Sequence, residues 1–472
     1  VQASSLVADN FNPNFPPDGS AAVSQEVVGT SESDNLTGGF GDDTIYGNGG
    51  NDEIDGQAGS DEIYGGEGDD VIIGNFGDDT LYGEAGNDII SDDQGANYLD
   101  GGEGDDTLSS RSLSGNHTLI GGSGQDNISG TGETLYIDGG EGQDSINIYG
   151  YVQNEGVSNY LSSGEATVLA GGGDDYIHAD NFINVNVRGG EGQDNFSSSN
   201  YNQWASTSVF YGEEGNDYGY LSRSYNAEFS GGKGGDSLTL EAVAFGNLSG
   251  GEGDDYINSN YGGNISFSGG DGNDTISSYR DFSPSLYGGE GDDDLSWRSS
   301  GWFEYGEIDR LFRDDDYNYE TQVGLLDGGE GNDILNIYGD STSIWNNFSP
   351  NIVAFAGEGD DTIQITDSSA GVIGQDGKNY GIREAQIDGG SGQDNISVSG
   401  VLNASITTGS GSDTVALTAQ QFRTIEEGNR IKYEEYWGEN GYEQREILIA
   451  EANAITVTDF TAGASGDIID YG

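Results

Sequence analysis

Six nonapeptides follow one another without interruption between Gly38 and Ser91, and they constrain the fold more than any other feature. They read GGFGDDTIY, GNGGNDEID, GQAGSDEIY, GGEGDDVII, GNFGDDTLY and GEAGNDIIS. Each has glycine at positions one and four, aspartate at position six and Ile or Leu at position eight. Nine residues hold one tight turn and one very short strand, so two nonapeptides close one coil of about 18 residues. The repeat therefore predicts an all-β solenoid, in which length adds coils instead of domains.

The residue at position eight of each repeat is predicted to point inward, because it is the middle of an alternating triplet. These residues are Ile45, Ile54, Ile63, Ile72, Leu81 and Ile90. One large apolar residue in nine buries too little surface to offset the entropy of ordering the chain. Aspartates 18 residues apart would stack at about 4.8 Å and repel one another unless a hard cation lies between them. An all-oxygen site of carboxylates and turn carbonyls suits Ca²⁺.

The pattern resembles the G-G-x-G-x-D-x-U-x signature of calcium-binding RTX repeats. This resemblance implies a right-handed parallel β-roll, in which each ion lies between successive turns of one edge. Backbone carbonyls and the sixth-position aspartates would hold the ion. A solvated acidic loop that happens to repeat is the alternative, and six tandem copies argue against it.

Beyond Ser91 the sixth-position aspartates recur at a modal interval of 19 residues instead of nine, so only one edge of each coil keeps a calcium turn. An apolar residue two positions before most of the glycine blocks indicates that the strand of the other edge persists. Intervals of 31, 23, 40, 28 and 33 residues predict variable loops inserted into that other edge. The predicted metal ligands are Asp43, Asp52, Asp61, Asp70, Asp79, Asp88, Asp106, Asp126, Asp144, Asp175, Asp194, Asp217, Asp236, Asp255, Asp274, Asp293, Asp333, Asp361, Asp394 and Asp413.

The inserted loops are rich in aromatic residues, which a flexible linker would lack. The aromatic and basic residues concerned are Tyr201, Trp204, Trp297, Arg298, Trp302, Phe303, Tyr305, Arg310, Arg313, Tyr317, Tyr319, Trp345 and Phe348. They either pack on one another to cover the edge or form a surface for sugar rings or another protein chain. Both interpretations remain open at the level of sequence.

The repeat pattern divides the chain into four segments. Residues 1–34 contain three prolines and no strand alternation, which predicts a linker or extension. Residues 35–100 are predicted as a two-edged roll and residues 101–416 as a one-edged roll with loop insertions. Residues 417–472 leave the glycine pattern and are predicted to cap the solenoid by a hairpin or short helix, with the chain continuing beyond Gly472. Asp459 and Asp467 in this last segment are candidates for a further metal site.

The formal net charge of −70, from 84 acidic and 14 basic residues, opposes any compact state without cations. It also disfavours nucleic acid and anionic membranes as partners. The chain has no cysteine, which excludes disulfides and thiol chemistry, and no apolar run long enough to span a bilayer. Weak calcium-binding modules are extracellular, so the chain is predicted to be secreted, and its family resemblance implies type I secretion.

Catalytic signatures are missing from the sequence. The only histidines are His117 and His178, and neither an H-E-x-x-H nor a G-x-S-x-G motif occurs. The chain is therefore predicted not to be an enzyme. It is predicted to bind on the order of 18 Ca²⁺ ions and to act as a structural or adhesive protein of a surface layer, sheath, filament or biofilm, associating with itself or with surface polysaccharide. The alternative is the calcium-dependent folding and secretion module of a larger exoenzyme or toxin.

Overall fold

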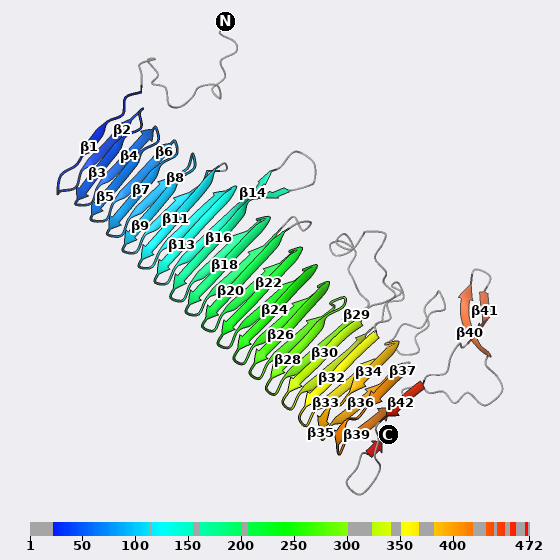
Figure 1. The fold of residues 1–472 in the computed structure, drawn as a ribbon. Coiled ribbons are helices and arrows are strands. Elements are labelled where there is room, and N and C mark those ends of the chain that lie inside the picture. Colours follow the sequence, from blue (N-terminus) through cyan, green and yellow to red (C-terminus); the bar gives the residue numbers. More distant parts are fainter. Residues whose placement is uncertain are drawn as a thin grey trace. The chain divides into compact units, whose positions relative to one another are not determined.

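The computed structural model describes residues 22–112, 115–153, 161–200, 206–300, 323–340, 351–367, 382–401, 403–418, 431–438, 441–448, 454–458 and 468–470. In these residues the only regular secondary structure is β-strand, and successive coils pair in parallel, which confirms the predicted β-solenoid (Figure 1). None of the described segments is a helix long and apolar enough to cross a membrane. The chain divides into two compact units, residues 1–246 and 247–472, and each is described by itself.

The first unit consists of two parallel sheets to which each coil contributes one strand. The first sheet contains β1 (Glu26–Val28), β3 (Thr44–Gly49), β5 (Glu62–Glu67), β7 (Thr80–Ala85), β9 (Tyr98–Glu103), β11 (Asn116–Ser123), β13 (Thr134–Glu141), β16 (Glu165–Gly172), β18 (Asn184–Glu191), β20 (Thr207–Glu214) and β22 (Asn226–Lys233). The second sheet contains β2 (Asn35–Gly39), β4 (Glu53–Ala58), β6 (Val71–Phe76), β8 (Ile89–Asp92), β10 (Thr107–Ser110), β12 (Asn127–Gly132), β14 (Ser145–Gln153), β17 (Tyr176–Asp180), β19 (Asn195–Ser199), β21 (Tyr218–Ser222) and β23 (Ser237–Glu241). β15 (Leu161–Ser163) pairs antiparallel with the end of β14.

The second unit repeats this arrangement, and β24 (Phe245–Glu252) contains the boundary between the units. Its first sheet contains β26 (Asn264–Asp271), β28 (Ser285–Glu290), β30 (Val323–Glu330), β32 (Asn351–Glu358), β34 (Glu384–Asp388), β35 (Ser391–Gly392), β37 (Asn403–Thr407), β38 (Ser410–Gly411) and β42 (Ala454–Thr458). Its second sheet contains β25 (Tyr256–Asn260), β27 (Thr275–Tyr279), β29 (Asp294–Ser300), β31 (Ile334–Asp340), β33 (Thr362–Asp367), β36 (Asn395–Ser399), β39 (Thr414–Thr418) and β43 (Ile468–Asp470). β40 (Ile431–Gly438) and β41 (Gly441–Leu448) form an antiparallel hairpin.

Two turns close each coil, and we name them the first and second edges. The first edge leads from a strand of the first sheet to the next strand of the second sheet. The second edge leads back to the first sheet of the following coil. All the longer intervals between aspartates fall on the second edge, for example the segment between β29 and β30. The insertions therefore leave the first edge and both sheets in register, as predicted.

The core is a set of inward-facing columns, each with one side chain per coil. Ile45 pairs with Ile63 and Ile63 with Leu81, and all three are fully buried. One position in the second sheet, Gly219, lacks a side chain where the repeat normally carries an apolar residue. The space is filled by Leu238, Phe229 and Phe210, whose side chains would lie 3.3–3.5 Å from a Cβ there. Larger residues elsewhere in the coil thus compensate for a missing one.

Trp297, which the sequence placed in an inserted aromatic loop, lies on β29 and is completely buried. Its placement in the loop was wrong, because the tryptophan pairs with Ile337 of β31 as an inward strand residue. Gly324 on β30 makes room for it, since a Cβ at Gly324 would overlap the indole ring.

Both predicted terminal segments contain strands of the solenoid. β1 lies within the expected linker 1–34 and pairs in parallel with β3, so the coil begins before the first full nonapeptide. After the β40–β41 hairpin, β42 pairs in parallel with β37 and β43 with β39. The segment predicted as a cap therefore adds strands to both sheets, because these strands satisfy the exposed backbone groups of the preceding coil.

Candidate calcium-binding edges

The twenty sixth-position aspartates are at most 3% exposed, although aspartate is normally a surface residue. Within each unit they form columns along the edges. The backbone N–H of Asp106 donates to Asp126 Oδ1 at 2.8 Å, and that of Asp126 donates to Asp144 Oδ1 at 2.9 Å. The column continues across the longest interval in the same way, with 2.9 Å between Asp293 N and Asp333 Oδ1. Oδ1 of each of these aspartates thus accepts a hydrogen bond from a backbone N–H of the preceding coil.

The second carboxylate oxygen, Oδ2, is buried and has no hydrogen-bond donor. This holds for Asp43, Asp52, Asp61, Asp70, Asp79, Asp88, Asp106, Asp126, Asp144, Asp175, Asp194, Asp217, Asp274, Asp293, Asp333, Asp361 and Asp394. A buried carboxylate oxygen without a partner is costly, and a repeating one requires an explanation. A cation bound to Oδ2 in each coil would be the missing partner and would explain the repetition.

The first glycine of each repeat shapes the space beside Oδ2. A Cβ on Gly38 would lie 2.6 Å from Asp43 Oδ2 and 2.7 Å from the carbonyl oxygen of Gly56 in the next coil. A Cβ on Gly121 would collide with Asp126 Oδ2 and with the Gly139 carbonyl oxygen. We call this space, lined by one Oδ2 and one carbonyl oxygen against a bare glycine, the cradle.

The donor set of the cradle fits Ca²⁺, a hard cation that takes oxygen ligands from carboxylates and backbone carbonyls. Among the described residues no three His, Asp or Glu side chains gather as a metal-binding group. Coordination by this chain would therefore depend on backbone carbonyls as much as on carboxylates. Glycine stands at position one of most repeats, where a larger side chain would fill this space. Ala170, Ala356 and Thr408 take that position in three coils of the first edge.

Burial also shifts the acidity of these carboxyl groups. It raises the pKa of Asp61, Asp106 and Asp175 to about 7, and the neighbouring carboxylates of the column raise it further than burial alone would. Hydrogen bonds from the backbone act in the opposite direction and are the weaker effect. Near neutral pH these three carboxyl groups are therefore partly protonated unless a cation replaces the protons.

The second edge carries an aspartate in three successive coils and other residues in the coils that follow. Its column runs through Asp43, Asp61 and Asp79, whose backbone N–H donates to Asn97 Oδ1 at 3.2 Å. The N–H of Asn97 then donates to Nδ1 of buried His117 at 3.3 Å. His117 pairs with Leu135, and from there the position is apolar or small.

The two residues that complete this transition were not identified from the sequence. His117 replaces an aspartate of the second-edge column, and burial lowers its pKa. Asp92 occupies the first position of a nonapeptide, where glycine is expected, and is also buried. The signal was present in the nonapeptide DDQGANYLD, whose first residue departs from the pattern.

The other histidine, His178, is partly exposed on β17. Its Nδ1 lies 2.9 Å from Ser197 Oγ and its Nε2 lies 3.2 Å from Asp180 Oδ2. The hydrogen bond to Asp180 raises the pKa of His178.

Several predicted residues lie outside the described residues. These are Tyr201, Trp204, Trp302, Phe303, Tyr305, Arg310, Arg313, Tyr317, Tyr319, Trp345, Phe348, Asp459 and Asp467. The recognition role of the aromatic loops and the further metal site therefore remain predictions.

Comparison with known families agrees with the geometry of the edges. A family model described as the RTX calcium-binding nonapeptide repeat (4 copies) matches residues 28–63, 55–90 and 82–112. Residues 28–112 match RTX calcium-binding repeats. The matched RTX segment is the part with aspartates on both edges. A search of curated proteins found no match. RTX repeat proteins are typically secreted.

Proposed function

We propose that this RTX protein is a secreted structural or adhesive protein that folds on Ca²⁺ and assembles at a cell surface or in extracellular matrix. The observation that carries the proposal is the recurrence of the aspartate column in both units, from Asp52 on β4's edge to Asp413 before β39. Metal binding in nearly every coil suits a protein in which the solenoid itself has the structural role.

The twenty sixth-position aspartates are the proposed ligands, and the total is on the order of 18 Ca²⁺ ions. Each ion offsets two of the negative charges in a chain whose net charge is −70. Because the ligands come together only in the folded coil, the free energy of ion binding contributes directly to folding. The proposed segments are those of the sequence analysis, with the two-edged roll at 35–100 and the one-edged roll at 101–416.

We propose no catalytic role. Among the described residues, the contact of Ser197, His178 and Asp180 comes nearest to a catalytic constellation. It lies on β17 and β19, which pair with each other and with strands on their other sides. The ladder uses the backbone N–H groups there, whereas acyl transfer needs free donors to stabilise an oxyanion.

Association between such acidic molecules, or with an acidic polysaccharide, requires cations at the contact. The described part of the chain offers outward tyrosines as directional contacts, among them Tyr176, Tyr218 and Tyr256, which are 42–47% exposed. Tyrosine is enriched in protein interfaces because it offers a large apolar area and a polar tip. We propose that the partners are copies of this protein or a surface polysaccharide.

The alternative function, a calcium-dependent folding and secretion module of a larger secreted enzyme or toxin, would use the same cradles. The mass of the native polypeptide, with peptide mapping beyond both ends of this sequence, distinguishes the two. A catalytic domain on the same polypeptide would favour the alternative.

Electron microscopy of the native material, with and without EGTA, tests the assembly. We expect ordered sheets or filaments in millimolar Ca²⁺ that dissolve in EGTA and are not restored by Mg²⁺, which prefers a smaller, octahedral site. Monodisperse molecules in millimolar Ca²⁺, together with hydrolytic activity of the intact polypeptide, would refute the structural role.

A further inference from the structure

Asp92 is the one aspartate of the described repeats that stands at position one of a nonapeptide. It ends β8 and pairs with Ser110 of β10, one coil after Gly74. In the two preceding coils of the same edge this position is Gly56 and Gly74, whose carbonyl oxygens line the cradles. Asp92 therefore brings a charged side chain to a place where the two preceding coils of this edge present only backbone.

The Asp92 carboxylate enters the last cradle of the second edge. A Cβ on Gly74 would lie 2.6 Å from Asp79 Oδ2 and closer still to Asp92 Oδ2. In the cradle at Gly38 the second of these oxygens is instead the carbonyl oxygen of Gly56, at 2.7 Å. A carboxylate has thus replaced a carbonyl as the second oxygen.

Both carboxylates are held by hydrogen bonds that leave Oδ2 available. Asp79 Oδ1 accepts the N–H of Asp61 at 2.7 Å, and Asp92 Oδ1 accepts the N–H of Gln94 at 3.0 Å. Both side chains are 1% exposed, and neither Oδ2 has a donor. Two carboxylate oxygens that converge on one buried point are complementary to a cation, which binds them when both groups are ionised.

We propose that Asp79 and Asp92 form a two-carboxylate calcium site that closes the second edge and binds Ca²⁺ more tightly than the carbonyl-completed cradles. The additional carboxylate balances both charges of the ion within the cradle, and affinity for Ca²⁺ rises with the number of charged ligands. The site also marks the end of the two-edged segment, because Asn97 and His117 follow it in the column. This inference rests on the proposed calcium binding of the other cradles.

The test uses the full chain and counts the bound calcium after dialysis against buffers of graded free Ca²⁺. Asp92→Asn removes the charge and keeps an oxygen for the Gln94 N–H. Asp92→Gly restores the repeat pattern and should fold even if Asp92→Asn does not. Asp93→Asn is the matched control, because it makes the same charge change at the exposed neighbouring residue.

We expect the wild-type protein to retain one ion at free Ca²⁺ about tenfold below the concentration that empties the other sites. Both Asp92 variants should lose this tightest ion, and Asp93→Asn should keep it. Asp92→Gly should still bind an ion at that cradle, with the affinity of the others. Asp92 variants that retain the tightest ion, or a wild-type chain whose ions all dissociate together, would overturn the inference. A wild-type chain that binds no calcium would instead overturn the proposed function.

Discussion

Asp126 shows how one aspartate acts in two ways, and substitution can separate them. Its Oδ1 accepts the Asp106 N–H at 2.8 Å, while its Oδ2 lines the cradle at Gly121. Asp126→Asn removes the anionic ligand but keeps an oxygen for the hydrogen bond. The native Asn97 already does this for the N–H of Asp79, at 3.2 Å. Asp126→Ala removes both functions.

The two substitutions should therefore differ by a predictable amount. Loss of an ion that would otherwise be present at 100 times its dissociation constant costs about 2.7 kcal/mol, and both variants lose it. Asp126→Ala also leaves the buried N–H of Asp106 without an acceptor, which costs about 1–3 kcal/mol more. The expected order of stability in saturating Ca²⁺ is wild type, then Asp126→Asn, then Asp126→Ala.

Urea denaturation of the full chain in millimolar Ca²⁺, followed by circular dichroism, measures these differences, and calcium counting on the same samples measures the lost ion. Asp105→Asn is the control: Asp105 is the exposed preceding residue, and its Oδ1 accepts only the N–H of Gln125. It should keep both stability and stoichiometry. If Asp126→Asn binds as much calcium as wild type, or if the Asn and Ala variants are equally stable, the assignment of the two oxygens is wrong.

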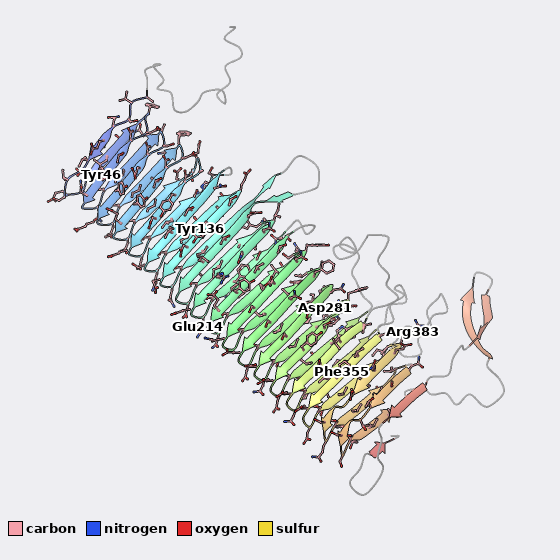
Figure 2. The ribbon with its side chains drawn as sticks, viewed as in Figure 1. Tyr46, Tyr136, Glu214, Asp281, Phe355 and Arg383 are labelled. Carbon is pink, nitrogen blue, oxygen red and sulfur yellow. The ribbon has the colours of Figure 1, made fainter. Side chains whose placement is uncertain are left out.

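Three further predictions follow from described residues. Without calcium, the folded coil should gain stability as the pH falls from about 7 to about 4, because burial holds the pKa of Asp106 near 7 and the folded state then binds more protons than the unfolded state. A chelated chain that gains no β-structure on acidification over this range contradicts this. Trp297→Ala should cost about 3–5 kcal/mol in urea denaturation, since it empties the largest buried side chain, and a loss under about 1 kcal/mol would mean that the core there collapses freely. Tyr64→Ala should cost about 1–3 kcal/mol by removing ring stacking on Tyr82, at 5.0 Å, and on Tyr46, at 5.2 Å, of which Figure 2 labels Tyr46. The calcium count should not change, and a changed count would link the outer face to the cradles.

The regular part of the fold could be predicted because each repeat encodes its own geometry. Three features of the repeat determine the coil, its core column and the buried aspartates. They are the period of nine or 19 residues, the glycine before each turn and the apolar residue in each triplet. The period also located the insertions, because the column of Asp293 and Asp333 continues across 40 residues of sequence. These features depend on neighbours in the same repeat or in the next coil.

Features that depend on packing across the coil were missed. Trp297 looked like a loop residue because its neighbours in sequence are aromatic and basic, yet Gly324 on another strand makes space for it inside. Asp92 departs from the repeat at position one, and His117 replaces an aspartate at a position that only the register with the neighbouring coil reveals. A repeat pattern predicts the positions of residues that follow the repeat. The roles of residues that depart from it depend on which residues lie beside them in the neighbouring coils.

The account depends most on the claim that calcium in the aspartate columns holds the solenoid together. Far-UV circular dichroism of the full chain, titrated from EGTA into millimolar Ca²⁺ with the bound ions counted in the same samples, tests it directly. We predict a disordered spectrum in EGTA that converts to a β spectrum as ions bind, reaching on the order of 18 per chain. A β spectrum that persists unchanged in chelator at neutral pH would contradict the claim.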